Sequence, residues 1–594
     1  MADPSNSFFQ SDQVDQQPMR HTLLFRLVGY LKPYWGSLII LLVLMAAGAA
    51  LEVMPSEFTL RLIDHHLAKG TLAGSGPLIA AFFGFLALAF CVHITRYVLL
   101  GWVGQMAMLD LRMQLFTHLM RRSTHFFHRN PVGRLMTRVI SDVQNLNEMF
   151  SSGFVAIVGD ALSLLAIMIW MFSKHAGLAA VALGIMPFLL IATEIFRRHA
   201  GDAFRETQGR YAAIQAYLQE QLSGMSLVQL NDQEARSRFA FMGLNQKYLS
   251  AFIRTIFAYA VFFPVVEFIT SATLAALIFY AGFKLQSGAL TLGLLLAFIQ
   301  QSGRFFRPIR ELAERYNVMQ TAMASSERIF RLLDNRDEIA EIPAAKPAVF
   351  QQEIRFVDVS FSYEDKGRQV VQSLSGVIEK GRRVAVVGHT GAGKSTLINL
   401  LMRFYDVNQG RILVDGLDLR ELRLKELRGL FGLVLQDVFI FSGSLEDNIL
   451  LGRPKDTRRL GLVLEQSQLD DMVARLPEGL ATQVGERGQK LSAGERQLLA
   501  FARMLYEEPA ILLLDEATAN IDSETEHKIQ TVIERVSHRL TTFTIAHRLS
   551  TIKDADEIWV MDQGRLIERG THDQLVAEEG HYAKLVRLQF EGQA

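Results

Sequence analysis

Apolar residues are spread very unevenly along this chain, and in its first half they gather into six long stretches. Each stretch approaches or exceeds the roughly 20 residues that a helix needs to cross a bilayer. The last one is the least clean, because Gln300, Gln301 and Arg304 interrupt it. Six buried helices of a soluble bundle would need a far larger protein around them. We therefore predict a membrane α-helical part with six transmembrane helices, at about 35–56, 77–100, 152–172, 177–195, 257–281 and 288–308.

The connections between these stretches alternate in length and in charge. Two long connections follow the second and the fourth stretch, and they carry most of the arginines of this half. Positive residues accumulate on the cytoplasmic side of membrane proteins. We therefore expect the long connections and both chain ends in the cytoplasm. Both connections continue with helix-like patterns, and twenty extra helical residues would extend roughly 30 Å beyond the bilayer.

The ends of the membrane part can also be placed from the polar pattern. Residues 1–19 are polar and lack the basic-then-apolar order of a secretory signal, so we expect a disordered N-terminal tail. Leucines at helical spacing among basic residues follow, and they favour a short amphipathic helix at the membrane surface over a packed soluble helix. The composition becomes soluble near Ala322. The pattern predicts a transmembrane domain at 20–325, a linker at 326–350 and a soluble domain at 351–590.

The composition narrows the classes of function. Of the 594 residues, 50% are hydrophobic and 21% are charged, as in a chain divided between lipid and water. The formal net charge is +0, so no basic surface points to nucleic acid. Cys91 is the one cysteine in the sequence, which excludes an intrachain disulfide and makes zinc clusters hard to build.

The second half alternates strand-like and helix-like segments. A short apolar run, Arg383–Val387, leads into a glycine-rich segment that fits the phosphate-binding loop G-x-x-x-x-G-K-[ST]. Glycines let the backbone approach phosphates, and N–H groups at a helix start favour negative charge. Lys394 would reach the outer phosphates, and Ser395 would place its hydroxyl on Mg²⁺. The predicted nucleotide loop consists of Gly388, His389, Thr390, Gly391, Ala392, Gly393, Lys394, Ser395 and Thr396.

Two further segments match such a site. A buried strand is predicted at Ile511–Leu514, and it ends in Asp515 and Glu516. Asp515 would hold Mg²⁺ and Glu516 would orient the attacking water, whereas the pair in isolation would also fit a plain helix cap. Leu491–Gln497 opens another helix with small residues, which makes a second anion site. Since one nucleotide needs one phosphate loop, this second site suggests that it serves the nucleotide of another copy.

Ionisable residues also fall inside the apolar stretches, where charges are costly and usually face an interior cavity. Asp160 and Glu267 lie well inside their segments. One hypothesis is that one or both line a substrate path and favour cationic cargo. The alternative, an interhelical polar contact, is equally consistent with the sequence.

Taken together, the motifs resemble an ATP-binding cassette (ABC) exporter half-transporter, over about residues 20 to 590. The resemblance implies the type IV (ABC exporter type 1) fold, in which six membrane helices are fused to an α/β P-loop nucleotide-binding domain with an antiparallel β subdomain and a helical subdomain. It implies ATP and Mg²⁺ as cofactors. The implied roles are adenine stacking for Tyr363, Mg²⁺ contact for Gln436, catalysis for Glu516 and His547, the D-loop for Asp522, and signature contacts to a partner's ATP for Ser492, Ala493, Gly494 and Glu495.

Three departures from the family pattern refine this resemblance. The signature motif has Ala493 and Glu495 where the family consensus has Gly and Gln, and the D-loop reads Ala-Asn-Ile-Asp up to Asp522. Glu495 adds negative charge near a partner's phosphates, which predicts a weaker trans site. The chain is most similar to paired, heterodimeric bacterial exporters, including the Mdl-type multidrug-like half-transporters. The expected partner is a second ABC half-transporter, with a heterodimer favoured over a homodimer.

The expected function is ATP-driven export of amphipathic or lipophilic, multidrug-like compounds across the bacterial cytoplasmic membrane. A lipid or peptide exporter subunit, or an ATP-gated regulatory subunit of a heterodimer, stays open as an alternative. Intact Glu516 and His547 argue against a pure binding module. Six membrane stretches exclude a soluble cassette ATPase, and the fusion of both parts in one chain argues against an importer. The sequence of the membrane helices shows no pattern that identifies the cargo, which could be a small molecule or a lipid.

Overall fold

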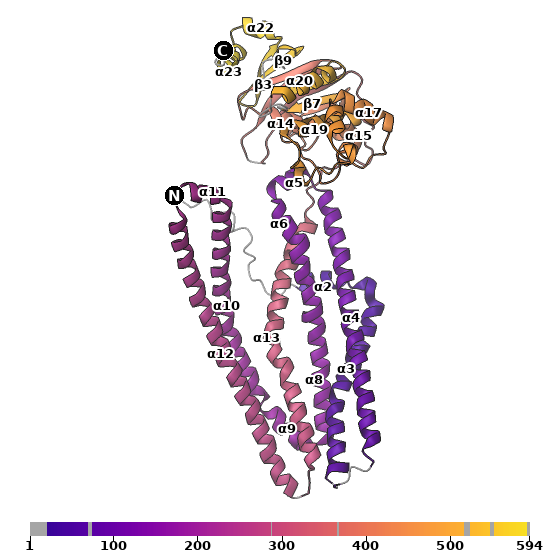
Figure 1. Ribbon diagram of the computed structural model, residues 1–594, viewed down its shortest axis with the longest axis vertical. Helices are drawn as coiled ribbons and strands as arrows, with labels where there is room; N and C mark the ends of the chain where they lie inside the picture. Colours follow the sequence, from indigo (N-terminus) through magenta and orange to yellow (C-terminus); the bar gives the residue numbers. More distant parts are fainter. Residues whose placement is uncertain are drawn as a thin grey trace. The chain divides into compact units, whose positions relative to one another are not determined.

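The computed structural model describes residues 21–68, 70, 74–286, 288–364, 367–515, 523–546 and 552–590. The chain divides into two compact units (Figure 1). The helical unit comprises the described residues up to Met120 together with Pro131–Asn335. The α/β unit comprises Arg121–Asn130 together with the described residues from Arg336 onward.

Long helices make up the helical unit, and each of the six predicted membrane stretches is helical over most of its length, although the sixth becomes helical only at Leu292. The elements are α2 (His21–Gly29), α3 (Trp35–Leu62), α4 (Gly76–Met120), α6 (Val132–Thr137), α7 (Val143–Glu148), α8 (Val155–Lys174), α9 (Ala176–Gly184), α10 (Met186–Ser223), α11 (Met225–Leu230), α12 (Glu234–Gln286) and α13 (Leu292–Asp334). The helices α4, α10 and α12 run well past their apolar stretches, as their polar continuations predicted. In Figure 1, α10 and α12 lie side by side and are joined by the short helix α11.

Five segments of the described chain are long and apolar enough to cross a membrane: Lys32–Leu67, Gly76–Met120, Val132–Lys174, Ala176–Ser223 and Glu234–Gln286. They contain the first five predicted stretches. The sixth stretch lies in α13, whose apolar run is interrupted by the polar residues noted above. Ser302 and Gln301 are buried in α13, so part of this polarity faces the packed interior of the unit.

The fourth stretch differs from expectation, because it is two helices rather than one. Helix α9 ends at Gly184, and α10 begins at Met186. Ile185 between them has φ −89° and ψ −12°. Pro187 follows in the first turn of α10, and proline has no N–H to donate to the carbonyl group four residues earlier. The missing hydrogen bond explains the break.

Two sheets form the α/β unit. The smaller, antiparallel sheet has the order β2-β1-β4-β5, and the larger sheet has the order β10-β9-β3-β8-β7-β6. In the larger sheet β10 is antiparallel to β9, and the other neighbouring strands are parallel. The strands are β1 (Glu353–Phe361), β2 (Val371–Glu379), β3 (Arg383–Gly388), β4 (Gln409–Val414), β5 (Leu417–Asp418), β6 (Phe431–Val434), β7 (Ile511–Asp515), β8 (Thr541–Ile545), β9 (Glu557–Asp562) and β10 (Arg565–Gly570).

Helices complete the unit and form a second core. They are α5 (Thr124–Arg129), α14 (Lys394–Leu401), α15 (Leu424–Gly429), α16 (Leu445–Leu450), α17 (Thr457–Gln466), α18 (Asp470–Arg475), α19 (Ala493–Tyr506), α20 (Ser523–Ser537), α22 (His572–Ala577) and α23 (His581–Phe590). One hydrophobic core lies between the two sheets around Phe356 and Trp559. A separate core joins α16, α17, α18 and α19 to the far side of β7. The predicted antiparallel and helical subdomains are therefore both present.

A short piece of the first half belongs with the α/β unit, although the sequence placed all of 20–325 in the transmembrane domain. Helix α5 is held there by Asp337, whose carboxylate accepts hydrogen bonds from Ser123 Oγ at 2.7 Å and lies 2.9 Å from His125 Nδ1. Burial would raise the pKa of Asp337, but these two hydrogen bonds outweigh it and hold the pKa below its ordinary value. The carboxylate is therefore charged at neutral pH.

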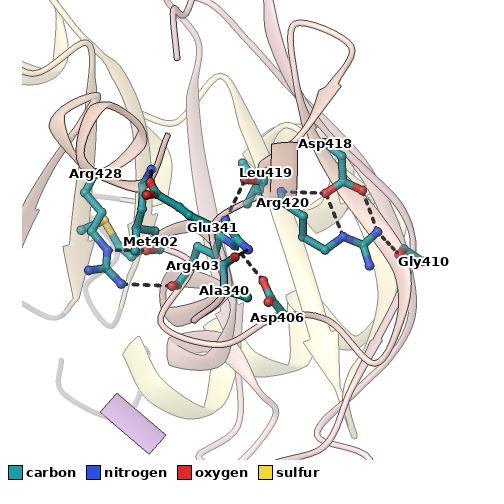
Figure 2. Close-up of polar contacts among 11 residues, drawn as sticks. Ala340, Glu341, Met402, Arg403, Asp406, Gly410, Asp418, Leu419, Arg420 and Arg428 are labelled. Atoms are coloured by element: carbon teal, nitrogen blue, oxygen red, sulfur yellow. Dashed lines mark hydrogen bonds and ion pairs between the residues drawn. The ribbon is translucent and has the colours of Figure 1, made fainter. Parts of the chain in front are cut away.

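The segment expected as a linker is divided between the two units. Helix α13 runs on to Asp334, and the residues from Arg336 lie along the α/β unit. Figure 2 shows how one part of this segment is held: the buried Arg403 donates to the carbonyl oxygen of Ala340 at 2.9 Å and to Asp406 at 2.8 Å. Arg428 in turn donates to the carbonyl oxygen of Arg403 at 3.1 Å. The segment is thus fixed by side chains that lie far from it in sequence.

Candidate functional site

The glycine-rich loop lies between β3 and α14, in the strand–loop–helix context that its motif requires. Gly388, Gly391 and Gly393 have φ angles of 152°, 85° and 97°. Such left-handed backbone suits glycine, because other residues rarely adopt it. Space also demands glycine, since a Cβ atom at Gly393 would lie 2.5 Å from the carbonyl oxygen of Val370. The loop therefore presents bare backbone next to the start of α14.

The side chains of this loop suit a phosphate ligand. Lys394 is 7% exposed, and its ammonium group donates to the carbonyl oxygens of Gly388 and His389 at 2.7 and 3.1 Å. The ammonium group is thus folded back over the loop at its centre. His389, Thr390 and Ser395 are exposed. Backbone N–H groups at a helix start, a positive charge and an accessible hydroxyl are what a triphosphate with its metal ion requires.

Asp515, the predicted Mg²⁺ ligand, lies at the same end of the parallel strands as the glycine-rich loop. Ile545 of β8 pairs with Val386 of β3 on one side and with Asp515 of β7 on the other. Since all three strands are parallel, Asp515 lies at the level of the residues that lead into the loop. Gln436 is exposed two residues after the end of β6, the neighbour of β7. Glu516, Asp522 and His547 lie outside the described residues.

Tyr363, the predicted adenine platform, lies against the helix that follows the loop. Its hydroxyl oxygen is 3.1 Å from Thr396 Oγ1 and accepts a hydrogen bond from Asn399 Nδ2 at 3.3 Å. Its ring meets Tyr405 edge to face, with centroids 5.0 Å apart at 88°. Tyr405 also contacts α5, because its hydroxyl lies 2.6 Å from His128 Nδ1. Sequence reasoning did not place Tyr405 or His128 at this site.

The second predicted anion site lies at the start of α19, where Ser492 and Glu495 form a capping box. Ser492 Oγ accepts from the backbone N–H of Glu495 at 3.1 Å, and Glu495 Oε2 accepts from the N–H of Ser492 at 2.8 Å. The carboxylate of Glu495 is thus bound to its own helix. Ser492 is exposed, Ala493 is partly exposed and Gly494 is buried. The S-x-x-E spacing could have predicted this cap from the sequence.

Comparison with known proteins decides the family. Residues 38–309 match the family described as ABC transporter transmembrane region, and residues 371–519 match the family described as ABC transporter. The chain is 36% identical over 589 residues to the uncharacterized ABC transporter ATP-binding protein YknV of Bacillus subtilis, covering 98% of this chain and 97% of that protein. This chain belongs to the ABC exporters.

Two further relatives agree with this assignment. The ATP-dependent lipid A-core flippase of Syntrophus aciditrophicus is 33% identical over 500 residues, covering 83% of this chain and 82% of that protein. The structure of a bacterial Atm1-family ABC exporter with ATP bound superposes with a TM-score of 0.76 at 28% identity, covering 93% of this chain and 98% of that one. The exporter is a half-transporter: it carries one membrane domain and one ATP-binding domain, hydrolyses ATP to drive transport, and functions as a dimer in the membrane.

A buried network in this exporter holds the segment after Gln436, and sequence reasoning missed it. Asn448 of α16 is fully buried; its side chain donates to the carbonyl oxygen of Phe441 at 2.9 Å and accepts from the N–H of Phe441 at 2.9 Å. Arg503 of α19 donates to the Asn448 side chain at 3.1 Å and to the carbonyl oxygen of Phe439 at 3.0 Å. Burial lowers the pKa of Arg503. The network ties the segment that follows Gln436 to the helix that begins at the signature motif.

The two intramembrane acids of the exporter lie in different surroundings. Asp160 of α8 forms an ion pair with Arg315 of α13 at 3.0 Å. This is the interhelical contact that the sequence allowed as an alternative to a substrate path. Glu267 of α12 is exposed on the single chain. The structure therefore does not bring Asp160 and Glu267 together by any contact between their described side chains.

Proposed function

We propose that this chain is the ATP-hydrolysing half of a dimeric exporter that moves amphipathic or lipophilic compounds outward from the cytoplasm or the inner leaflet. The observation that carries this proposal is that the two predicted anion-binding segments belong to separate helix starts. The loop around Lys394 lies at the carboxyl ends of the parallel strands, whereas Ser492 caps a separate helix and is itself exposed. A single chain thus offers two anion-binding surfaces, and each would complete the site of a partner.

Each residue of this site has its own proposed role. Backbone N–H groups of the loop and Lys394 would hold the phosphates, and Tyr363 would hold the adenine. The hydroxyl of Ser395, the carboxylate of Asp515 and the amide of Gln436 offer oxygen atoms, which are the ligands that Mg²⁺ prefers. When bound, Mg²⁺ would neutralise charge on the phosphate oxygens. Glu516 would orient the attacking water, His547 would sense the terminal phosphate, and Asp522 would contact the partner across the interface.

The partner proposed here is a second half-transporter, and we favour a different chain over an identical one. The departures at Ala493 and Glu495 support this choice, because such substitutions fit a pair of unequal sites. The proposed setting is the bacterial cytoplasmic membrane, with both chain ends and the ATP-binding domain in the cytoplasm. The arginines of the two long connections support this orientation.

The native mass and ATPase rate of the chain expressed alone test the arrangement. A stable, active dimer of this chain would contradict the heterodimer and leave the exporter assignment intact. Monomers or inactive aggregates that become active when a second half-transporter is co-expressed would support it. Export itself is tested with inverted vesicles: ATP-dependent uptake of lipophilic dyes is expected, and its loss in Lys394→Ala separates it from passive binding.

A further inference from the structure

Residues 336–350, which we call the linker segment, lead the chain from α13 to the first strand of the α/β unit. They lie outside the helices and strands of the unit, so side chains hold them in place. One set of contacts fixes the segment just before and at the start of α15. Lys346 forms an ion pair with Glu421 at 3.0 Å, and the Glu341 carboxylate accepts a hydrogen bond from the N–H of Leu424 at 2.5 Å. Another contact fixes the segment to α14, the helix that begins at the ATP loop.

Arg403 makes this second contact from the end of α14. Its guanidinium is buried and donates to the carbonyl oxygen of Ala340 at 2.9 Å, to the Asp406 carboxylate at 2.8 Å and to the carbonyl oxygen of Leu419 at 3.4 Å (Figure 2). The planar fork of an arginine binds its acceptors in fixed directions. The linker segment is therefore tied at Ala340 to the helix that carries Lys394.

The backbone at Arg403 is left-handed, with a φ angle of 47°. It follows the last turn of α14, where the N–H of Arg403 bonds to the carbonyl oxygen of Leu400 at 3.0 Å. The N–H of Phe404 bonds to the carbonyl oxygen of Asn399 at 2.9 Å. Glycine is the usual residue at such a helix end, because a side chain makes left-handed backbone costly. Arg403 carries this cost, and the hydrogen bonds of its guanidinium offset it.

A second arginine holds the same helix end. Arg428 of α15 donates to the carbonyl oxygens of Met402 and Arg403 at 3.2 and 3.1 Å. Its guanidinium also lies 5.0 Å from the centroid of the Phe404 ring. Burial and the neighbouring charge of Arg403 lower the pKa of Arg428. The fold thus keeps two like charges close together in order to fix the end of α14.

Two segments that adjoin membrane helices in the chain contact the end of α14 at nearby residues. Tyr405 contacts His128 of α5, and Arg403 contacts Ala340 of the linker segment. Helix α14 has 8 residues from its start at Lys394, so its two ends are only about two turns apart. A nucleotide bound at the start of α14 and a segment held at its end therefore act on one short helix.

We propose that Arg403 is a positioning residue that couples ATP binding to the linker segment. ATP at the loop fixes the start of α14, and Arg403 transmits this change to Ala340 and so to the chain that leads back to α13. The inference goes beyond the hydrolysis of ATP, and it does not depend on which compound is exported.

Amide hydrogen exchange in the full-length exporter tests this coupling. Exchange is measured with and without saturating AMP-PNP, a non-hydrolysable ATP analogue, in the presence of Mg²⁺. In the natural protein the analogue should slow exchange several-fold both at the ATP loop and in the linker segment. In Arg403→Gly the slowing should persist at the loop and vanish in the linker segment, because glycine suits the left-handed backbone but cannot reach Ala340.

The matched control is Arg420→Ala. Arg420 donates to Asp418 at 2.6 Å and to the carbonyl oxygen of Gly410 at 3.4 Å, beside the Arg403 cluster (Figure 2). This variant should keep the slowing in the linker segment. Arg403→Lys retains one charged donor and should keep part of it.

The nucleotide-dependent difference separates coupling from a static anchor. If linker exchange in Arg403→Gly accelerated by the same factor with and without AMP-PNP, Arg403 would be an anchor only and the inference would be overturned. A linker segment that ignored the analogue in the natural protein would overturn it as well. Should Arg403→Gly not fold, as judged by Tm, Arg403→Asn provides the same test, because asparagine also tolerates left-handed backbone. Failure of dye export with this coupling intact would contradict the proposed function only.

Discussion

The Nδ1 atom of His128 lies 2.6 Å from the hydroxyl oxygen of Tyr405, although 277 residues separate the two in sequence. Tyr405 also meets the edge of Tyr363, whose own hydroxyl lies 3.1 Å from Thr396 at the start of α14. Helix α5, which the chain places between membrane helices, is therefore joined to the ATP loop by three successive contacts. Burial raises the pKa of Tyr405, so its phenol keeps its proton at neutral pH.

Removing the hydroxyl of Tyr405 should loosen α5 while leaving the ring contact to Tyr363 in place. The net value of one such hydrogen bond is about 0.5–1.5 kcal/mol. Amide hydrogen exchange across Thr124–Arg129 should therefore accelerate roughly two- to tenfold in Tyr405→Phe. The control is Tyr506→Phe, which removes a tyrosine hydrogen bond of 2.7 Å to Pro454 elsewhere in the α/β unit. Equal acceleration in both variants would mean that the effect is general destabilisation.

Truncating the same ring should act on the nucleotide. In Tyr405→Ala, Tyr363 loses the aromatic ring that packs edge to face against it. Such aromatic pairs contribute about 0.5–1.5 kcal/mol of stability beyond the burial of their surface. We expect the Kd for ATP to rise several-fold in Tyr405→Ala and to change little in Tyr405→Phe. Isothermal titration of the detergent-solubilised exporter measures both. If the two variants bind ATP equally well, Tyr405 does not position the predicted adenine platform.

Local patterns in the sequence predicted the parts of the site that a single segment builds. Gly388 to Thr396 form the expected strand–loop–helix, and the predicted buried strand at Ile511–Leu514 is β7. The packing of α5 on Asp337 and Tyr405 was not predictable in this way. It joins residues more than 200 positions apart, and neither His128 nor Tyr405 belongs to a recognisable pattern. The hydrophobic pattern also did not predict the helix break at Ile185, because the apolar run continues through that residue.

The carboxylate of Glu495 should matter less to the partner's ATP than its charge suggests. It accepts a hydrogen bond from the N–H of Ser492, and the positive end of α19 partly offsets its charge. Glutamine can form the same capping box, so Glu495→Gln should keep both stability and the KM for ATP nearly unchanged. Glu495→Ala removes the reciprocal hydrogen bond and should cost about 0.5–1.5 kcal/mol of stability, the net contribution of one such bond. A large fall in KM in Glu495→Gln alone would support charge repulsion instead.

Lowering the pH should weaken the attachment of α5 to the α/β unit, because it protonates the Asp337 carboxylate. Burial acts to raise its pKa, but the hydrogen bonds from Ser123 and His125 prevail and lower it from 3.8. A carboxyl group with a lowered pKa in the folded state stabilises fully above its unfolded pKa, and it loses that contribution as the pH falls below it. The difference in Tm between the natural protein and Asp337→Asn should thus be constant between about pH 5 and 8 and shrink below about pH 4. A difference that did not shrink at low pH would contradict this role of the Asp337 charge.

Glu516→Gln should bind ATP yet stall turnover. The substitution keeps the size of the side chain and removes the charge that would orient the attacking water, and loss of such a group typically lowers the rate by about 10²–10⁴-fold. ATP binding should persist, because the loop around Lys394 and the cap at Ser492 are untouched. The measurement is the ATPase rate beside the Kd for ATP in the same preparation.

In a dimer of identical chains, near-normal hydrolysis would contradict the assignment of Glu516. In a heterodimer, residual hydrolysis should vanish only when the corresponding acid of the partner is also replaced, and this difference separates the two assemblies.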